Sequence, residues 1–352
     1  MLNKSGFIWP VRGFAVRKSD VISAILAARK DLLPQHTSSK AYAPSNIALC
    51  KYWGKRDQEL NLPITSSFSI SLGNKGATTE LSVNSDAYDV AFLNDQPIDW
   101  VSSFGKRLLA FLDLFRVTRD LHFSVNIKTN IPIGAGLASS ACGFASLVKA
   151  LDGLFGWELQ DHELSILARF GSGSASRSIW QGFVEWHVGI KADGMDSYGE
   201  VISDPWPELR IGLLVLNERE KPVSSRDAMQ RTVTTSALYS AWPAKVSRDL
   251  SALKQAINLK DFAMLGKTAE SNAMTMHATM LSAWPVICYF LPETIVAMNK
   301  IWQLRQEGFN LFFTQDAGPN LKLLFLEKDT ATVQGHFPEM EVIEPFVNTP
   351  YN

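Results

Sequence analysis

The sequence predicts an α+β protein built from two lobes that meet at a central cleft. Strand-like segments dominate from Ala41 to Val101 and return near 121–128, whereas the chain beyond Ser236 has the apolar spacing of helices. Two apolar segments near the end predict the strands that close the fold. The predicted late helices cover 245–257, 261–278 and 292–307, and the predicted final strands cover 309–313 and 321–326.

The first 38 residues are predicted to form an extension that precedes the first lobe. Val21 to Leu33 has the pattern of a short helix with mixed faces. Basic residues before Asp20 resemble a transit peptide, but Pro10 interrupts any amphipathic helix, so we interpret the stretch as a packing arm and not as a secretory signal. The two lobes are expected at 39–195 and 196–352, with their boundary in the Asp-, Gly- and Pro-rich stretch 189–207.

Composition excludes several classes of protein. With 352 residues and 46% hydrophobic content, the chain can bury one large core or two lobes. The formal charge of −1 argues against a nucleic-acid partner, and the apolar window 281–298 is broken by prolines, so no membrane span is expected. Three cysteines without metal-site spacing fit reduced thiols in a cytoplasmic protein. The six histidines are scattered, so a protein-only zinc site is not expected.

A glycine-rich turn precedes a predicted helix over 141–154. The run Ile131-Pro-Ile-Gly-Ala-Gly-Leu-Ala-Ser-Ser-Ala141 places two hydroxyls, Ser139 and Ser140, where the helix should start. A helix N-terminus offers free N–H groups and the positive end of its dipole, which favours a phosphate ligand. An ordinary turn is the alternative. The run is neither a Walker loop nor a dinucleotide fingerprint, because it lacks both spacings.

A second motif follows a predicted buried strand at 46–49. The segment Asn46-Ile-Ala-Leu-Cys-Lys-Tyr-Trp-Gly-Lys-Arg56 places Lys51, Lys55 and two aromatic residues within a few positions. Cations often face only water, but their mixing with Tyr52 and Trp53 is more typical of a binding-site wall. The next strand alternates serines with apolar residues over 67–72, which predicts a half-buried strand.

Two further motifs contain candidate binding and acidic groups. In Phe170-Gly-Ser-Gly-Ser-Ala-Ser-Arg-Ser178, the turn offers N–H and hydroxyl donors, and Arg177 could bind a carboxylate in bidentate fashion. A capped loop with a surface arginine is the alternative. In Phe312-Phe-Thr-Gln-Asp-Ala-Gly-Pro-Asn320, Asp316 falls just beyond a strand, where it could cap its own turn or act as a rigidly held carboxylate.

Together these motifs resemble the signature segments of the GHMP small-molecule kinase superfamily. The superfamily shares P-x-x-x-G-L-A-S-S-A, present here from Pro132. Four other runs resemble the mevalonate diphosphate decarboxylase branch: N-I-A-L-x-K-Y-W-G-K-R, G-S-G-S-A-x-R-S, G-F-V-E-W and D-A-G-P-N. The resemblance extends from about Ser39 to the last strands. It implies a GHMP-kinase-like two-lobed fold and ATP- and Mg2+-dependent decarboxylation of mevalonate 5-diphosphate to isopentenyl diphosphate. It also implies a homodimer.

The resemblance implies a role for each matching residue. Asp316 would act on the C3 hydroxyl as base or positioning carboxylate, Lys51 would keep Asp316 ionised, and Arg177, with Asn46, would hold the C1 carboxylate. The implied substrate-diphosphate ligands are Tyr52, Lys55, Ser172, Gly173, Ser174 and Arg226. The implied ATP-phosphate ligands are Gly134, Ala135, Gly136, Leu137, Ala138, Ser139, Ser140 and Ser225, with Ser140 also placed near magnesium.

Three positions depart from the family pattern without removing a charged site group. Ser176 stands where cysteine is frequent, Gln315 where an aromatic residue is common, and Cys142 where alanine is usual.

Two other enzyme activities remain as alternatives: one that phosphorylates C3 and stops, and one that accepts a monophosphate. A ligand sensor without activity would be expected to have lost at least one charged site group, and all are present.

Overall fold

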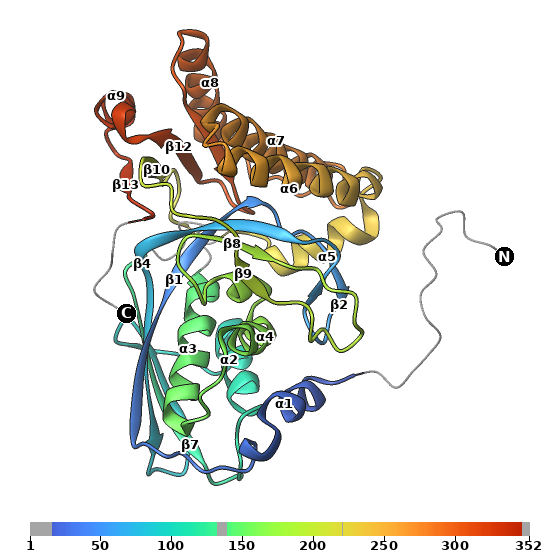
Figure 1. Cartoon of the computed structure of the whole chain (residues 1–352), viewed down its shortest axis with the longest axis vertical. Helices are drawn as coiled ribbons and strands as arrows, with labels where there is room; N and C mark the ends of the chain where they lie inside the picture. Colours follow the sequence, from blue (N-terminus) through green and yellow to red (C-terminus); the bar gives the residue numbers. More distant parts are fainter. Residues whose placement is uncertain (1–15, 132–138, 220, 347–352) are drawn as a thin grey trace, which may run out of the picture.

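The computed structural model describes residues 16–131, 139–219 and 221–346, which form two lobes, each with its own sheet (Figure 1). The first lobe holds a seven-stranded sheet in the order β6-β5-β7-β4-β8-β9, with β1 paired to β4. Its strands are β1 Ser38–Cys50, β4 Ser67–Asn84, β5 Val90–Leu93, β6 Gln96–Pro97, β7 His122–Thr129, β8 Phe183–Trp186 and β9 Gly199–Val201; a separate hairpin joins β2 Lys55–Asp57 and β3 Leu62–Pro63.

Helices α3 and α4 form the interior of the first lobe beside the sheet (Figure 1). The predicted helix at 141–154 is confirmed as α3, Ser139–Phe155, whose Phe144, Leu147, Val148 and Leu151 are all buried. Their three- and four-residue spacing gives α3 one apolar face against β1 and β4. The other helices are α1 Lys18–Leu26, η1 Ala27–Arg29, α2 Ser103–Leu112, α4 Asp161–Gly171 and η2 Gly173–Arg177.

The second lobe packs helices on a four-stranded antiparallel sheet in the order β11-β12-β10-β13. Its predicted late helices and final strands are confirmed, with ends shifted by up to three residues. The strands are β10 Leu209–Leu214, β11 Phe312–Gln315, β12 Leu321–Leu326 and β13 Glu341–Ile343. The helices are α5 Ser225–Thr235, η3 Tyr239–Ala241, α6 Trp242–Asn258, α7 Phe262–Leu281, α8 Pro292–Gln306, η4 Glu327–Asp329 and α9 Thr330–His336.

Two parts of the sequence-based prediction are incomplete. Helices α2 and α5 were not predicted, although each has a serine cap: Ser102 accepts from the Gly105 N–H, and Ser224 from the Asp227 N–H. The expected lobe boundary at 195/196 precedes β9, which pairs with β8 and therefore extends the first sheet to Val201. Within the described ranges, no helix combines the length and apolar character that crossing a membrane requires.

The serine-rich start of β4 is buried on both faces, so the expectation of a half-buried strand is wrong. Ser67, Ser69 and Ser71 are at most 1% exposed, as are the apolar residues between them. Helix α3 covers one face of this part of the sheet, and α6 contacts β4 as well. The buried hydroxyls are satisfied by hydrogen bonds: Ser67 accepts from Arg177 and Ser71 from the Gly182 N–H.

Strand β1 carries two irregularities just before functional candidates. Its register against β4 shifts between Pro44 and Asn46 and again between Ala48 and Cys50. Between Ala48 and Cys50 the extra residue is Leu49 of β1, as in a β-bulge, whereas between Pro44 and Asn46 the extra residues lie in β4. Asn46 directly follows the first irregularity, and Lys51 follows the end of the strand.

The N-terminal segment is a packed part of the first lobe. The predicted helix at 21–33 is shorter and begins earlier: α1 ends at Leu26 and one 3-10 turn follows. Val21, Ile22, Ile25 and Leu26 are buried in the main core. The Arg29 guanidinium donates to the carbonyl of Trp157 at 2.7 Å, which ties the segment to the end of α3.

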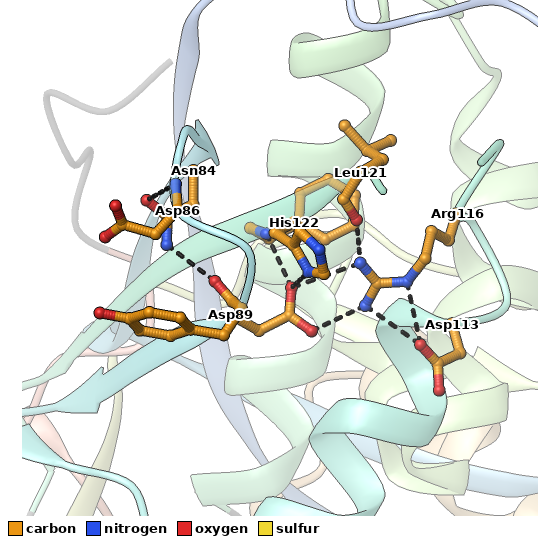
Figure 2. Close-up of polar contacts among 9 residues, drawn as sticks. Asn84, Asp86, Asp89, Asp113, Arg116, Leu121 and His122 are labelled. Atoms are coloured by element: carbon orange, nitrogen blue, oxygen red, sulfur yellow. Dashed lines mark hydrogen bonds and ion pairs between the residues drawn. The ribbon is translucent and has the colours of Figure 1, made fainter. Parts of the chain in front are cut away.

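An ion-pair network fixes the outer edge of the first sheet (Figure 2). The Asp89 carboxylate accepts from Arg116 Nη2 at 2.8 Å and from the Phe123 N–H at 2.7 Å. Arg116 also donates through Nε to Asp113, at 3.1 Å, and to the carbonyl of Leu121. These contacts join the turn after α2 to the parallel strands β5 and β7.

Candidate active site

The two lobes meet at an ion pair between Lys51 and Asp316. Lys51 follows β1 of the first lobe, and Asp316 follows β11 of the second, as predicted from the strand end. Lys51 Nζ lies 2.7 Å from Asp316 Oδ1. The Lys51 side chain is 2% exposed and that of Asp316 25%, so the carboxylate is the member of the pair that a ligand can reach.

Asp316 has a second lysine partner that the sequence interpretation missed. Lys322, in β12, lies with Nζ 3.2 Å from Asp316 Oδ2 and is also 2% exposed. Burial alone would raise the pKa of Asp316, but the charges and hydrogen bonds of Lys51 and Lys322 hold that pKa well below its usual range. Asp316 is therefore ionised and only weakly basic at neutral pH.

Backbone contacts hold both members of the pair in place. The Lys51 N–H donates to Asn272 Oδ1 at 2.8 Å, and Asn272 Nδ2 donates to Asp249 at 2.7 Å. His277 Nε2 lies 3.1 Å from the carbonyl oxygen of Asp316. Burial lowers the pKa of His277 to about 3, so the imidazole is neutral and can donate to that carbonyl. Asn272 and His277 lie on α7, and no sequence motif marked either residue.

Arg177 is buried at the end of η2, not exposed on a surface loop. Its Nε and Nη2 donate to Asn46 Oδ1 at 3.3 and 3.2 Å, and its Nη1 donates to Ser67 Oγ at 2.6 Å. Asn46 is held in turn by Ser178 at 2.7 Å. Burial lowers the pKa of Arg177 to about 10, which still leaves it charged at neutral pH. The expected neighbours Arg177 and Asn46 thus lie in direct contact.

The turn before Arg177 lies against Tyr52. A Cβ placed on Gly173 would lie 2.8 and 2.9 Å from the Tyr52 ring and hydroxyl and 3.0 Å from Trp186. Tyr52 packs edge-on against Trp186, with their ring centroids 4.7 Å apart. The buried Tyr52 hydroxyl has no hydrogen-bond partner among the described residues. A buried hydroxyl without a partner is unusual and fits a group that binds a polar ligand.

Serine hydroxyls connect this turn to the start of α3. Ser172 Oγ lies 3.2 Å from Ser174 Oγ and 3.3 Å from Ser140 Oγ. The candidate residues Gly134, Ala135, Gly136, Leu137 and Ala138 lie outside the described residues, as does the side chain of Ser139. The helix itself begins at Ser139, so its N-terminus adjoins the Ser172–Ser174 turn.

A group of cations lies on the Tyr52 side of the site. Lys55 Nζ donates to Asn61 at 2.6 Å. Burial, together with the charges of Arg226, Lys18 and Arg107, lowers the pKa of Lys55 to about 8. The Nε of Arg107 is buried without a partner among the described residues. Mutually repelling cations of this kind are typical of a site for a highly charged anion. Lys18 and Arg107 carried no motif and were missed.

Lys221, which no sequence motif marked, joins the start of α5 to the turn that carries Asp316. Lys221 Nζ donates to Ser225 Oγ at 2.6 Å and to the carbonyl of Ala317 at 2.8 Å. Ser225, a predicted phosphate ligand, opens α5, and Arg226 follows it. Arg56, by contrast, donates to the backbone carbonyls of Val188, Gly189 and Lys191, so its contacts stabilise the loop after β8.

The described residues suit a magnesium ion that arrives with phosphates. No cluster of three or more His, Cys, Asp or Glu side chains with metal-site geometry occurs in the described ranges. Magnesium is commonly held by one or two protein oxygens together with substrate phosphates and water, so no such cluster is required. Ser140, the residue expected near magnesium, lies in the first turn of α3, with its hydroxyl 3.3 Å from Ser172 Oγ.

This fold and site define a class, the GHMP-type small-molecule kinases and their relatives that transfer phosphoryl groups. Residues 43–199 match the family described as diphosphomevalonate decarboxylase-like N-terminal domain. Residues 211–349 match the mevalonate 5-diphosphate decarboxylase C-terminal domain. The chain belongs to the mevalonate diphosphate decarboxylase family.

Individual relatives support the same assignment. Diphosphomevalonate decarboxylase mvd1 of Aspergillus fumigatus is 39% identical over 316 residues, covering 83% of this chain and 78% of that protein. The mevalonate diphosphate decarboxylase structure from Staphylococcus aureus aligns with a TM-score of 0.83 at 33% identity, covering 89% of this chain and 96% of that one. The structure of MDDEF in complex with MVAPP, AMPPCP and magnesium aligns with a TM-score of 0.80 at 39% identity, covering 88% of this chain and 96% of that one.

Proposed function

We infer that this protein catalyses the ATP-dependent decarboxylation of mevalonate 5-diphosphate to isopentenyl diphosphate, with phosphorylation of the C3 hydroxyl as the first step. One observation carries the assignment of the reacting centre: the Lys51–Asp316 ion pair, 2.7 Å long, joins the two lobes, and Asp316 is its more exposed member. The related MDDEF complex contains MVAPP, AMPPCP and magnesium, which supports ATP and Mg2+ as the cofactors of this chain.

In the first step, Asp316 orients the C3 hydroxyl toward the γ-phosphorus of ATP. The hydroxyl oxygen forms the new P–O bond, and ADP leaves with the electrons of the old one. The low pKa of Asp316 favours a carboxylate that accepts a hydrogen bond throughout and takes the proton only late in transfer. Phosphoryl transfer depends chiefly on position and charge neutralisation, which Lys51 and Lys221 can provide.

In the second step, phosphate leaves C3 with the C–O electron pair. The C1–C2 bond then breaks, its electrons form the C2–C3 double bond, and C1 leaves as carbon dioxide. Arg177 and Asn46 are proposed to orient the C1 carboxylate, because they place charged and amide donors together in a buried position. Water must be excluded until this step is complete, since it would trap the developing cation.

The diphosphate end of the substrate is assigned to the cation group around Lys55. The proposed ligands of the substrate diphosphate are Tyr52, Lys55, Ser172, Gly173, Ser174 and Arg226. The unpartnered Tyr52 hydroxyl and the lowered pKa of Lys55 support this assignment. The proposed ligands of the ATP phosphates are Gly134, Ala135, Gly136, Leu137, Ala138, Ser139, Ser140 and Ser225. Magnesium, with Ser140 as a proposed ligand, would neutralise phosphate charge when bound.

Three properties of the whole protein are part of the proposal. The proposed division is an N-terminal extension at 1–38, whose helix α1 packs on the first lobe, a first lobe at 39–195 to which the adjoining strand β9 is added, and a second lobe that carries Asp316. It functions in the cytoplasm, which three sparse cysteines suit. It forms a homodimer, as the family resemblance implies.

Product analysis tests the proposed reaction. Purified protein, magnesium and ATP are incubated with mevalonate 5-diphosphate or mevalonate 5-phosphate, and the products are identified by mass spectrometry. Isopentenyl diphosphate from the diphosphate is expected. Product from the monophosphate alone would reassign the substrate, and a stable 3-phosphorylated acid would indicate a kinase. Absence of ADP with either substrate would support a ligand sensor.

A further inference from the structure

The Asp316 carboxylate is held by one lysine from each lobe. Lys51, at the end of β1, contacts Oδ1 at 2.7 Å, and Lys322, in β12, contacts Oδ2 at 3.2 Å. Both lysine side chains are 2% exposed. The contact with Lys51 crosses between the lobes, whereas the contact with Lys322 lies within the sheet that also carries Asp316.

Lys322 is fixed more firmly than a surface lysine would be. Its backbone pairs with Leu213 of β10 on one side and with Thr314 of β11 on the other. The neighbouring residues of β12 are apolar and buried. A buried charge is costly unless it is paired, so a lysine in this strand implies a specific use for its charge.

Asp316 itself has limited local support. It lies in the turn between β11 and β12, where the Gly318 N–H and the His277 ring contact its carbonyl oxygen and not its carboxylate. Rotation of the carboxylate is restrained by the two lysines. With Lys51 alone, the direction of the free carboxylate lone pairs would depend on a single contact across the lobes.

We propose, resting on the function proposed above, that Lys322 is a positioning residue for the reaction: it orients the Asp316 carboxylate toward the C3 hydroxyl and helps to keep it ionised. Lys322 acts through Asp316, because it contacts Oδ2 of that residue and is itself almost fully buried. The role is separate from substrate binding, which involves the Tyr52 and Arg177 side of the site.

The charges around Asp316 make the pH dependence of kcat a test of the proposal. The titratable and charged groups that interact with it are Lys51 after β1, Lys322 in β12, Lys221 before α5, Arg177 in η2 and the neutral His277 on α7. Removal of Lys322 subtracts one of these cations. The pKa of Asp316 then rises, and the acidic decline in kcat begins at a higher pH.

The test compares Lys322→Met, Lys322→Gln and Lys322→Arg. The uncharged variants are expected to lower kcat about tenfold or more, a usual consequence of losing an orienting partner, with KM for ATP and mevalonate 5-diphosphate within twofold. Their acidic limb moves up in pH, and Lys322→Arg recovers most of kcat. Either uncharged variant suffices if the other does not fold. Lys75→Met, which breaks the Lys75–Glu341 pair, is the control and keeps wild-type kcat.

A double-mutant comparison separates positioning from general support of the fold. In the Asp316→Asn background, measured with excess enzyme over hours, Lys322→Met should cause no further loss. The proposal is overturned if Lys322→Met keeps kcat within twofold, or if kcat falls equally in both backgrounds. Failure of wild-type protein to release carbon dioxide from mevalonate 5-diphosphate would instead refute the proposed function.

Discussion

Lys51 and Asp316, 265 positions apart in the sequence, form a partly buried 2.7 Å contact between the ends of two strands from different lobes. Each residue lies just beyond the last hydrogen-bonded position of its strand, where the backbone is held but the side chain can point into the interface. Catalysis at this position therefore depends on correct packing of both lobes.

Replacement of Asp316 by asparagine should abolish most turnover. The amide cannot take the hydroxyl proton and leaves both lysines without a counter-charge, so kcat should fall by about 10²–10⁴-fold. Binding of ATP and substrate, measured by calorimetry, should change little. Asp89→Asn is the control, because it removes a partly buried carboxylate from the network of Figure 2 in the first lobe and should lower stability without lowering kcat. Near wild-type turnover of Asp316→Asn would remove Asp316 from the chemistry.

Arg177→Ala should weaken binding of the substrate and reduce carbon dioxide release. The variant leaves Asn46 and Ser67 without their shared donor. We expect KM for mevalonate 5-diphosphate to rise about tenfold or more, the usual scale for losing a charge-assisted hydrogen bond, while KM for ATP stays close to wild type. Steady-state kinetics with a melting curve of the variant provide the measurement. An unchanged KM in a folded variant would refute the assignment of Arg177.

A methyl group at Gly173 should damage the substrate site. Its Cβ would lie 2.8 Å from the Tyr52 ring and 3.0 Å from Trp186, closer than packed atoms allow. Gly173→Ala should therefore displace Tyr52 and raise KM for the substrate several-fold. Gly335→Ala, on α9 with open space around the added atom, is the matched control. It should keep activity and add up to about 1 kcal/mol of stability; equal effects of the two variants on KM would contradict the prediction.

Substrate affinity should decrease above about pH 8. The pKa of Lys55 is lowered to about 8 by burial and by nearby cations. The protonated amine attracts the diphosphate, so affinity is complete below that pKa and is lost as pH rises through it. KM for mevalonate 5-diphosphate, measured from pH 7 to 9.5 at constant ionic strength, should rise several-fold. Lys55→Arg, which stays charged, should show a flatter profile; a flat profile in the wild type would exclude Lys55 as a ligand.

Sequence patterns predicted the elements whose signals are local. The spacing of apolar residues identified α3 and the late helices, and the strand end before Asp316 was correct. The serine strand was predicted half-buried because the alternation of residues along one strand cannot reveal that other elements cover both of its faces. Helices α2 and α5 were missed although each follows a serine cap, because their apolar spacing was not recognised.

The polar support of the site could not be predicted from local sequence. Lys322 interrupts an apolar strand, which is a weak signal of a buried functional charge, but its partner becomes evident only when β12 pairs beside β11. Asn272 and His277 resemble ordinary helix residues until α7 places them against Lys51 and Asp316. Contacts between distant segments determine these roles.

The ratio of carbon dioxide to ADP formed from mevalonate 5-diphosphate tests the central claim most directly. Carboxyl-labelled substrate allows both products to be counted in the same reaction of the wild-type protein with magnesium and ATP. We predict one carbon dioxide for each ADP, with isopentenyl diphosphate as the organic product. Formation of ADP without carbon dioxide would contradict the coupled reaction and would indicate that phosphorylation at this site is not followed by loss of C1.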